Sequence, residues 1–392
     1  MKKKILFING HLNTGGVEKS LLDILKHLDY NRYDVDLLLL EELGDYAPEL
    51  PEQVHLKLKS LKNTYGSFFH SLRQCIAKKD YLCFRMRILF LCKKAFGNTV
   101  YKPISKALLG HIHYDCAIGF RTGICADLAA YGVDAEKRIV WWHHGMLPQD
   151  IKERHNFFLL SAKLDQIVSV SDSCAEMLES ELKIDKGKIS VICNMVDTAN
   201  INKKARAFSP YDSDGKTVIV SVGRIAPEKH FENVIFAAEY LIAHQLQSFE
   251  WHIVGGGWDY DKICHLVQEH RLGQYVIMEG NQTNPYPYIK NADLFVHPSY
   301  VESQGLTVLE AMALRVPCVV TKSLGPCEFI KDGINGILTE QTPESMAEKV
   351  AEMLINRELY EQIRANTCCP EQFAPRDVMQ RVNSLLEKRY EE

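Results

Sequence analysis

Two glutamates stand in a pattern that suits the binding of a phosphorylated sugar. In the stretch VESQGLTVLEAM, seven residues separate Glu302 from Glu310, and Gly305 and Thr307 lie between them. An apolar, strand-like run ends just before this stretch, which predicts a loop at Glu302, a helix start at Gly305 and a helical position for Glu310. Backbone N–H groups at a helix start bind phosphate, and a glycine allows close approach. Thr307 is expected either to cap this helix or to donate to a phosphate oxygen.

The two carboxylates have candidate roles as hydrogen-bond acceptors for hydroxyl groups. A carboxylate in such a loop can accept from sugar hydroxyls, and one in the helix can accept twice from a ribose diol. As alternatives, Glu302 favours the helix dipole and Glu310 is a surface charge. The neighbours of Glu310, TVLEAMAL, are apolar almost all round, and a buried glutamate needs a partner. The ligand-binding interpretation is therefore preferred for Glu310.

A second candidate site lies in SVGRIAPEKH, directly after the apolar run TVIVSV. Gly223 lets the chain turn where the strand ends, and Arg224 and Lys229 then follow on a loop before the next helix. Two fixed cations at this edge of a sheet suit a diphosphate, because arginine offers a planar fork of donors and lysine a compact charge. Taken alone, the stretch is explained equally well by a pair of surface cations.

These stretches need a scaffold that brings strand ends together, and the rest of the chain predicts one. Apolar runs such as KKILFING, DVDLLLL and QIVSVS alternate with helix-length amphipathic stretches, which is typical of parallel sheets covered by helices on both faces. A polar, strandless stretch at 202–216 predicts a linker between two doubly wound α/β domains, 1–201 and 217–375. Sites in such folds lie beyond the carboxyl ends of the strands, so an interdomain cleft is expected.

Composition narrows the class of protein. With 392 residues, 46% of them hydrophobic and 24% charged, the chain fits two soluble globular domains. The apolar run in MKKKILFING is too short for a secretory leader, and no stretch approaches the ~18 apolar residues of a membrane span. The 12 cysteines form no CxxC pair, which favours reduced thiols in a cytosolic protein over a zinc site.

The segment 55–113 has an uneven charge. Asp80 is its one acid, and its basic residues interleave with apolar ones, as in YLCFRMRILFLCKKAF. A basic amphipathic surface of this kind suits anionic lipid headgroups. A solvated helix face is the plainer alternative, and nucleic-acid binding is a third, weaker one because no nucleic-acid-binding motif accompanies the charge. The basic residues are Lys57, Lys59, Lys62, Arg73, Lys78, Lys79, Arg85, Arg87, Lys93, Lys94, Lys102 and Lys106.

Three stretches together resemble the retaining, nucleotide-sugar-dependent glycosyltransferases of family 4, of the type that makes bacterial surface polysaccharides. They are GRIAPEK, ESQGLTVLEAMA and the amino-terminal GHLNTGGVEKSLLDILKHL, and the resemblance continues through VICNMVD, IVGGG and GPCEFIKDGINGIL. It implies the GT-B fold: two Rossmann-like, doubly wound parallel-sheet domains that face an interdomain cleft. Residues 1–201 would bind the acceptor, residues 217–375 the nucleotide sugar, and a terminal helix at 376–392 would pack back on the amino-terminal domain.

Carried over residue by residue, the resemblance implies a donor site in the cleft. Arg224 and Lys229 would hold the diphosphate, Glu302 the hexose hydroxyls and Glu310 the ribose. Backbone amides of 305–307 would complete the phosphate cradle, the Gly15–Gly16 turn would close over it, and Gly280 would lie near the base. The donor-binding residues implied are Gly15, Gly16, Gly223, Arg224, Lys229, Gly280, Glu302, Ser303, Gln304, Gly305, Leu306, Thr307 and Glu310.

A histidine and a glutamine add detail to this expected site. In IVWWHHGMLPQD, His143 matches best a family histidine that faces the donor sugar from a first-domain strand, and His144 is its rival. His143, Glu302, Arg224 and Lys229 are the expected catalytic residues. Gln304 stands where the family often has phenylalanine, which is expected to alter how the sugar is read.

The resemblance implies a hexosyltransferase that acts with retention of configuration and without a metal or other cofactor. A UDP-sugar is the expected donor, with GDP-mannose its rival, and the expected acceptor is a saccharide, preferably lipid-linked, in capsule or similar polysaccharide synthesis. The protein is expected to be cytoplasmic and peripheral at the inner face of the membrane. A nucleotide-sugar 2-epimerase and a non-catalytic partner subunit of the same fold stay open as alternatives.

Overall fold

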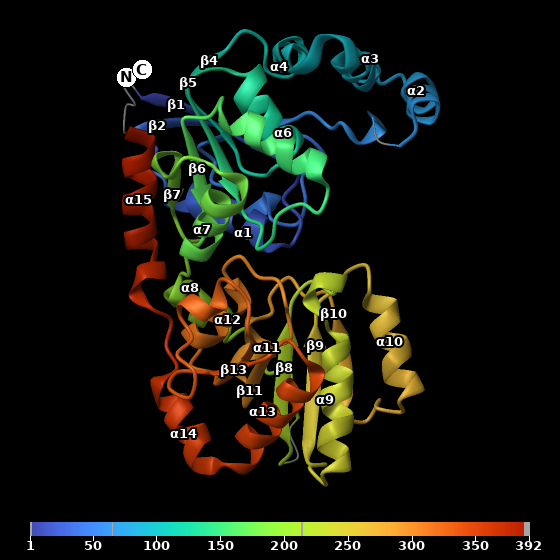
Figure 1. The fold of residues 1–392 in the computed structure, drawn as a ribbon, viewed down its shortest axis with the longest axis vertical. Coiled ribbons are helices and arrows are strands. Elements are labelled where there is room, and N and C mark those ends of the chain that lie inside the picture. The colour runs from blue at the N-terminus through green and yellow to red at the C-terminus, as the bar shows by residue number, and fades with distance from the viewer. Residues whose placement is uncertain (1, 65, 213–214, 388–392) are drawn as a thin grey trace.

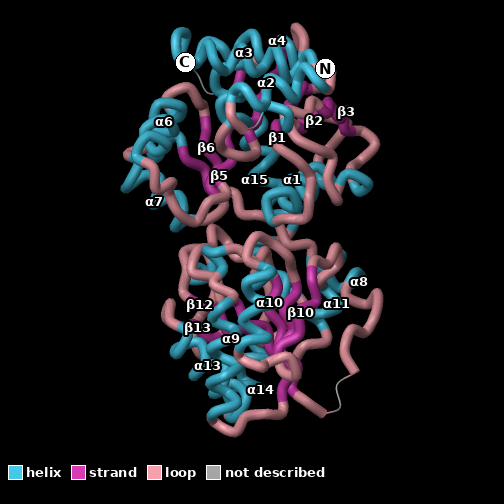
Figure 2. The backbone as a smooth tube through the Cα atoms, turned by 90° about the vertical axis from the view of Figure 1, so that its right-hand side faces the viewer, coloured by secondary structure: helices cyan, strands magenta, loops and turns pink. Residues whose placement is uncertain are grey.

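The computed structural model describes residues 2–64, 66–212 and 215–387 and folds them into two α/β domains. Part of the predicted linker (213–214) and part of the predicted terminal helix (388–392) lie outside the described residues. Figure 1 shows the two domains one above the other, and the view in Figure 2, turned by 90°, shows the same two lobes. Each lobe is built around one parallel sheet.

The amino-terminal sheet has, in the described residues, seven parallel strands in the order β3-β2-β1-β4-β5-β6-β7. The central strands are buried apolar runs, and helices cover both faces, as the alternation in the sequence predicts. The strands are β1 (Lys3–Asn9), β2 (Tyr33–Leu39), β3 (Val54–Leu58), β4 (His113–Gly119), β5 (Asp134–Trp142), β6 (Gln166–Ser169) and β7 (Ile189–Val191). The helices are α1 (Gly16–His27), α2 (Phe68–Ala77), α3 (Tyr81–Phe96), α4 (Tyr101–Leu109), α5 (Ile124–Asp127), α6 (Ile151–Ser161) and α7 (Asp172–Leu182).

The carboxyl-terminal sheet has, in the described residues, six parallel strands in the order β10-β9-β8-β11-β12-β13. Its strands are β8 (Thr217–Val222), β9 (Phe249–Val254), β10 (Val276–Gly280), β11 (Leu294–His297), β12 (Cys318–Thr321) and β13 (Ile337–Thr339). Its helices are α9 (Glu232–Ala243), α10 (Tyr260–Glu269), α11 (Tyr286–Lys290), α12 (Leu306–Ala313), α13 (Pro343–Ile355) and α14 (Arg357–Asn366). The strand order turns back at β8 in this sheet and at β1 in the other, so the loops after the central strands of both sheets are available for binding.

The chain crosses between the domains earlier than the predicted boundary at residue 201. Helix α8 (Thr198–Lys204) enters the predicted linker, and Val196, Ile201 and Ala205 pack in the core of the carboxyl-terminal domain. The prediction placed Val196 and Ile201 in the amino-terminal domain and Ala205 in the linker, because the apolar partners of these side chains lie far along the sequence.

Helix α15 (Pro375–Glu387) returns to the amino-terminal domain, and Figure 1 shows it in red beside the blue and green strands. Its apolar residues Val378, Val382 and Leu386 join the core around β1 and α1. Lys3 Nζ donates a hydrogen bond to the Leu386 carbonyl oxygen at 3.1 Å. Both ends of the described chain therefore lie in the same domain.

Candidate functional site

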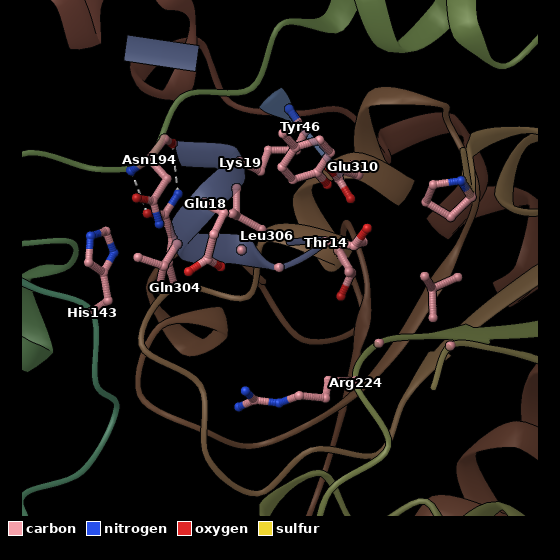
Figure 3. A pocket seen from close by; sticks show the side chains of 18 of the residues that line it. Thr14, Glu18, Lys19, Tyr46, His143, Asn194, Arg224, Gln304, Leu306 and Glu310 are labelled. Carbon is pink, nitrogen blue, oxygen red and sulfur yellow. Dashed lines mark hydrogen bonds between the residues drawn. The ribbon is translucent and has the colours of Figure 1, made fainter. Parts of the chain in front are cut away.

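A cavity of about 940 Å³ lies between the two domains, lined by the loops that follow β1, β4 and β5 above and β8, β9 and β11 below. Its lining combines six acidic and six basic side chains with glycine backbone, so it suits a polar, charged ligand better than an apolar one. Figure 3 shows side chains of both domains converging on this space.

Glu302 forms the centre of a buried ion-pair cluster on the floor of the cavity. Lys229 Nζ lies 2.6 Å and His297 Nε2 2.7 Å from Glu302 Oε1, and the Glu302 side chain is 13% exposed. Burial opposes ionisation of this carboxyl, but Lys229 and His297 outweigh it and hold its pKa well below the usual range. Among the described residues both of these contacts go to Oε1, which leaves Oε2 for a ligand.

Arg224 supplies a second cation from the same strand-to-helix loop. Its Nη2 lies 3.0 Å from Glu228 Oε1, and its guanidinium lies 5.9 Å from the ring centroid of Trp258. The Arg224 side chain is 58% exposed, and Figure 3 shows it reaching into the cavity below Glu18. A guanidinium held at one side and open at the other can pair with phosphate oxygens.

Helix α12 begins at the cavity, with Gly305 as its N-cap in a left-handed conformation (φ 81°). A Cβ at Gly305 would lie 2.8 Å from Pro326 Cγ, so glycine is required here for space as well as for backbone conformation. Val308 N donates to the Gly305 oxygen, whereas the Leu306 and Thr307 amides precede the intrahelical ladder and can bind an anion. No side-chain hydrogen bond caps α12, so the alternative that Thr307 caps the helix is wrong.

Glu310 lies one turn further along α12 and is 6% exposed. Tyr286 Oη donates to its Oε1 at 2.9 Å. Burial raises the pKa of Glu310, and the charge of Lys19 with the Tyr286 hydrogen bond offsets that rise only in part. Lys19 and Tyr46 come from the amino-terminal domain and face Glu310 in Figure 3. A buried carboxyl with these partners can accept hydrogen bonds from a diol.

His143 and His144 follow β5 and face the cavity from the opposite domain. The His143 ring lies against Phe120, with 4.9 Å between the ring centroids, and its Nε2 is buried without a hydrogen-bond partner among the described residues. Burial lowers the pKa of His143 to about 3, with His144 and Arg121 adding to the effect. A neutral imidazole with a free Nε2 can bind a ligand hydroxyl. His144 Nε2 instead contacts Thr122 Oγ1 at 3.0 Å.

The depressed pKa of His143 predicts an acid-sensitive contribution to stability. Between the folded value of about 3 and an unfolded value of ~6.5 the unfolded chain binds more protons, so the free energy of unfolding falls as the pH drops through this range. Between about pH 7.5 and 4.5, we expect the free energy of unfolding of His143→Gln to fall by about 2–3 kcal/mol less than that of the unsubstituted protein. Urea denaturation at both values measures this, and parallel losses in the two proteins would contradict it.

Gln304 has a different contact from the one expected. Its side chain is 2% exposed, and its amide pairs with the backbone of Asn194: Asn194 N donates to Oε1 at 2.6 Å, and Nε2 donates to the Asn194 oxygen at 2.9 Å. Ser20 Oγ of α1 in turn donates to Asn194 Oδ1 at 2.6 Å. Gln304 therefore ties the start of α12 to the amino-terminal domain, and a phenylalanine could make neither bond.

We expect Gln304→Ala to lower the free energy of unfolding by about 2–4 kcal/mol, because it leaves the buried N–H and C=O of Asn194 unpaired. Gln362→Ala is the matched control, since the Gln362 amide donates one exposed hydrogen bond to the Gly333 oxygen. Urea denaturation of both variants measures the difference. Equal costs would show that the Gln304–Asn194 pair contributes no more than a surface contact.

The structure brings nearly all of the predicted site residues together in this cavity. Gly280 is the exception: it ends β10, and the following residues 281–283 line the cavity in its place. Prediction from the sequence missed His297, Asn194 and Gly145; a Cβ at Gly145 would lie 2.6 Å from the Glu302 carbonyl carbon. Of these three residues, only Asn194 lies in a stretch, VICNMVD, that the family resemblance had marked. Within the described residues, no group of three or more His, Cys, Asp and Glu side chains could hold a metal ion.

The known proteins that this chain resembles in sequence include several glycosyltransferases. Residues 203–368 match the family model described as Glycosyl transferases group 1. The chain is 28% identical over 196 residues to the poly(ribitol-phosphate) alpha-N-acetylglucosaminyltransferase of Staphylococcus aureus, which covers 50% of this chain and 38% of that protein. It is 29% identical over 261 residues to the UDP-Gal:alpha-D-GlcNAc-diphosphoundecaprenol alpha-1,3-galactosyltransferase of Escherichia coli, which covers 62% and 65%. The matched parts span less than two thirds of either relative.

Among solved structures, Anabaena Alr3699/HepE in complex with UDP and glucose superposes on the whole chain. The TM-score is 0.73 at 18% sequence identity, and the superposition covers 99% of this chain and 100% of that one. At this identity the likeness concerns the fold, and it confirms the predicted arrangement of two facing parallel-sheet domains.

Proposed function

We propose that this chain, a GT-B protein whose residues 203–368 match the group 1 glycosyl transferases, moves a hexosyl group from a nucleoside-diphosphate sugar to a saccharide hydroxyl. The observation that carries the proposal is the convergence of Lys229, Arg224 and the start of α12 in one cavity with the hydroxyl-binding candidates Glu302 and Glu310. The cations and helix amides match the diphosphate of such a donor, and the two carboxylates match the hydroxyls of its hexose and its ribose.

The proposed reaction needs stabilisation of the departing diphosphate. The acceptor oxygen forms a bond to the anomeric carbon as the bond from that carbon to the phosphate oxygen breaks, and the acceptor proton passes to the leaving phosphate. Lys229, Arg224 and the amides of Leu306 and Thr307 are placed to stabilise the charge that develops on the phosphate, the role a metal ion fills in other transferases. We therefore expect the activity to persist in EDTA.

Retention of configuration is proposed from the relatives and from the side chains present. Both relatives have alpha products in their names, and one of them uses UDP-Gal, a donor whose sugar is alpha-linked. Glu302 Oε1 is occupied by Lys229 and His297, which suits a hydroxyl-binding role better than attack on carbon. A UDP-hexose is the proposed donor, and a lipid-linked saccharide of a surface polysaccharide is the proposed acceptor.

Thermal shift with UDP-glucose, UDP-galactose, UDP-N-acetylglucosamine and GDP-mannose tests donor binding. Saturating donor is expected to stabilise the protein by about 2–3 kcal/mol at a hundredfold excess over Kd. Glu310→Gln should weaken donor affinity about tenfold or more, since one ribose hydrogen bond to a charged group is lost, and so roughly halve the stabilisation at the same donor concentration. Glu52→Gln, which replaces an exposed acid in the other domain, should not. No shift with any donor would contradict the proposal. A changed sugar formed without acceptor would identify an epimerase.

We further propose that α2 and α3 hold the protein on an anionic membrane. Figures 1 and 2 show these helices projecting from the amino-terminal domain on the side away from the other domain. Large apolar side chains on them are exposed, among them Tyr81 (80%), Phe96 (66%) and Ile76 (62%). None of the helices in the described part of the chain has both the length and the apolar character needed to cross a membrane. An interfacial position at the inner face is therefore the proposal.

The contacts within the segment show which cations to replace. Lys93 Nζ donates to Tyr101 Oη, and Arg87 Nη2 donates to the Gly66 oxygen, so both have contacts within the domain. Arg73, Lys79, Arg85 and Lys94 are exposed, and their combined replacement by glutamine should weaken binding to phosphatidylglycerol vesicles about a hundredfold or more. Vesicle flotation measures this, with phosphatidylcholine vesicles as the control. Unchanged binding would contradict the proposal and favour the alternative that these cations belong to a solvated helix face.

A further inference from the structure

Glu18 is a buried carboxylate of the cavity that neither the donor site nor the core requires. It lies in the first turn of α1 and is 3% exposed. Its Oε2 lies at the Gly15 turn, where a Cβ would come within 2.5 Å of it. Figure 3 shows the carboxylate directed into the space between α1 and the start of α12.

The other oxygen, Oε1, has no hydrogen-bond partner among the described residues. Arg121 Nη1 lies 3.6 Å and His11 Nδ1 3.8 Å away, distances that are too long for hydrogen bonds but short enough to share a bound hydroxyl. The His11 ring lies between two donors, with Asn13 N 3.2 Å from its Nδ1 and Arg121 Nη1 3.2 Å from its Nε2, and one of these two ring nitrogens accepts in the neutral ring. Oε1 is thus a buried acceptor without a partner among the described residues, with two cationic or polar side chains beside it.

The negative charge of Glu18 indicates which kind of ligand group Oε1 can bind. A second carboxylate beside the donor diphosphate would repel it, so Oε1 suits a group that donates hydrogen bonds. Arg121, 34% exposed in its side chain, can donate to the same ligand. A carboxylate beside a guanidinium is the pairing that binds two neighbouring hydroxyls, one as donor and one as acceptor. In the proposed donor site, Glu302 of the opposite domain binds the hydroxyls of the donor sugar.

We propose that Glu18 and Arg121 bind the acceptor saccharide, with Glu18 Oε1 accepting a hydrogen bond from a hydroxyl next to the one that attacks. This inference rests on the proposed glycosyl transfer and adds the residues that orient its acceptor. The attacking hydroxyl keeps its proton until the phosphate takes it, so Glu18 forms no covalent bond and removes no proton.

Saturation-transfer NMR with methyl glycosides tests this assignment. The probes are methyl α-glucoside, α-galactoside, α-mannoside and N-acetyl-α-glucosaminide, each added to the protein with UDP. We expect at least one probe to bind the unsubstituted protein, about tenfold weaker binding to Glu18→Ala, and partial recovery in Glu18→Gln, whose amide oxygen still accepts. Glu52→Ala, an exposed acid of the same domain, is the control.

UDP-induced thermal shifts of the same variants separate this proposal from the function on which it rests. Unchanged UDP binding in Glu18→Ala together with lost glycoside binding supports the assignment. Glycoside binding equal to that of the unsubstituted protein, no glycoside binding by a protein that binds UDP, or a parallel loss of UDP binding and melting temperature would each overturn it. If UDP fails to bind at all, the proposed donor site is wrong, and the glycoside measurement still decides the role of Glu18.

Discussion

Lys229→Ala is expected to lower the transfer rate about a hundredfold to a thousandfold and to destabilise the protein by about 3 kcal/mol. The rate falls because the variant loses one of the two cations that we propose to face the departing phosphate. The stability falls because Glu302, whose side chain is 13% exposed, keeps a charge whose remaining ion-pair partner among the described residues is His297. Initial rates with donor and acceptor, and urea denaturation, measure the two effects.

The double variant Lys229→Ala/Glu302→Gln separates these causes. Removing the carboxylate charge should restore most of the lost stability without restoring transfer, because neither the cation nor the proposed hydroxyl-binding carboxylate returns. Lys262→Ala is the matched control, since Lys262 is 55% exposed and pairs with Glu232 at 3.6 Å on the surface. If Lys229→Ala were as stable as Lys262→Ala, solvent would already screen the Lys229–Glu302 pair.

Gly145→Ala is expected to reduce the transfer rate about a hundredfold without unfolding either domain. The added Cβ would lie 2.6 Å from the Glu302 carbonyl carbon and 2.8 Å from Ser303 N, and both atoms belong to the backbone. The loop after β5 and the loop after β11 must then separate, which displaces Glu302. If Glu302 binds the donor as we propose, a shift of about 1 Å costs about this much rate.

Gly273→Ala provides the control for Gly145→Ala, because a Cβ at Gly273 meets no atom within 4 Å. Small-angle scattering and transfer rates of both variants should show a wider interdomain spacing and a lower rate for Gly145→Ala alone. A Gly145→Ala protein with unchanged rate would mean that the two loops can shift without moving Glu302.

The sequence predicted the carboxyl-terminal half of the site well because that half is local. Glu302, Gly305 and Glu310 belong to one strand–loop–helix unit, and the strand end and helix start alone determine their relative positions. The fold was predictable for a similar reason, since buried parallel strands are continuous apolar runs. The glycosyltransferase resemblance is confirmed at the level of the GT-B fold and the group 1 match.

The contacts between the domains were not predictable in this way. Glu18 stands in an ordinary first helical turn, Gly145 in a histidine-rich loop, and Gln304 at a position expected to read the sugar. Each acquires its role from residues more than a hundred positions away, as Gln304 does from Asn194. The early domain crossing was missed because Ile201 finds its apolar partners only in the folded domain.

Because α15 returns to the amino-terminal domain, the carboxyl-terminal domain is an insertion within it. Two neighbouring connecting segments join the two domains. Val196 N donates to the Phe373 oxygen at 2.7 Å, so the outgoing and returning connections are bonded side by side. Two segments that are hydrogen-bonded side by side bend readily about one axis and resist rotation of one domain against the other. Opening and closing of the cleft would then follow one path. In this structure Leu306 lies beside Gly16 across the cleft, where an added Cβ would be 3.6 Å from Leu306 Cδ1.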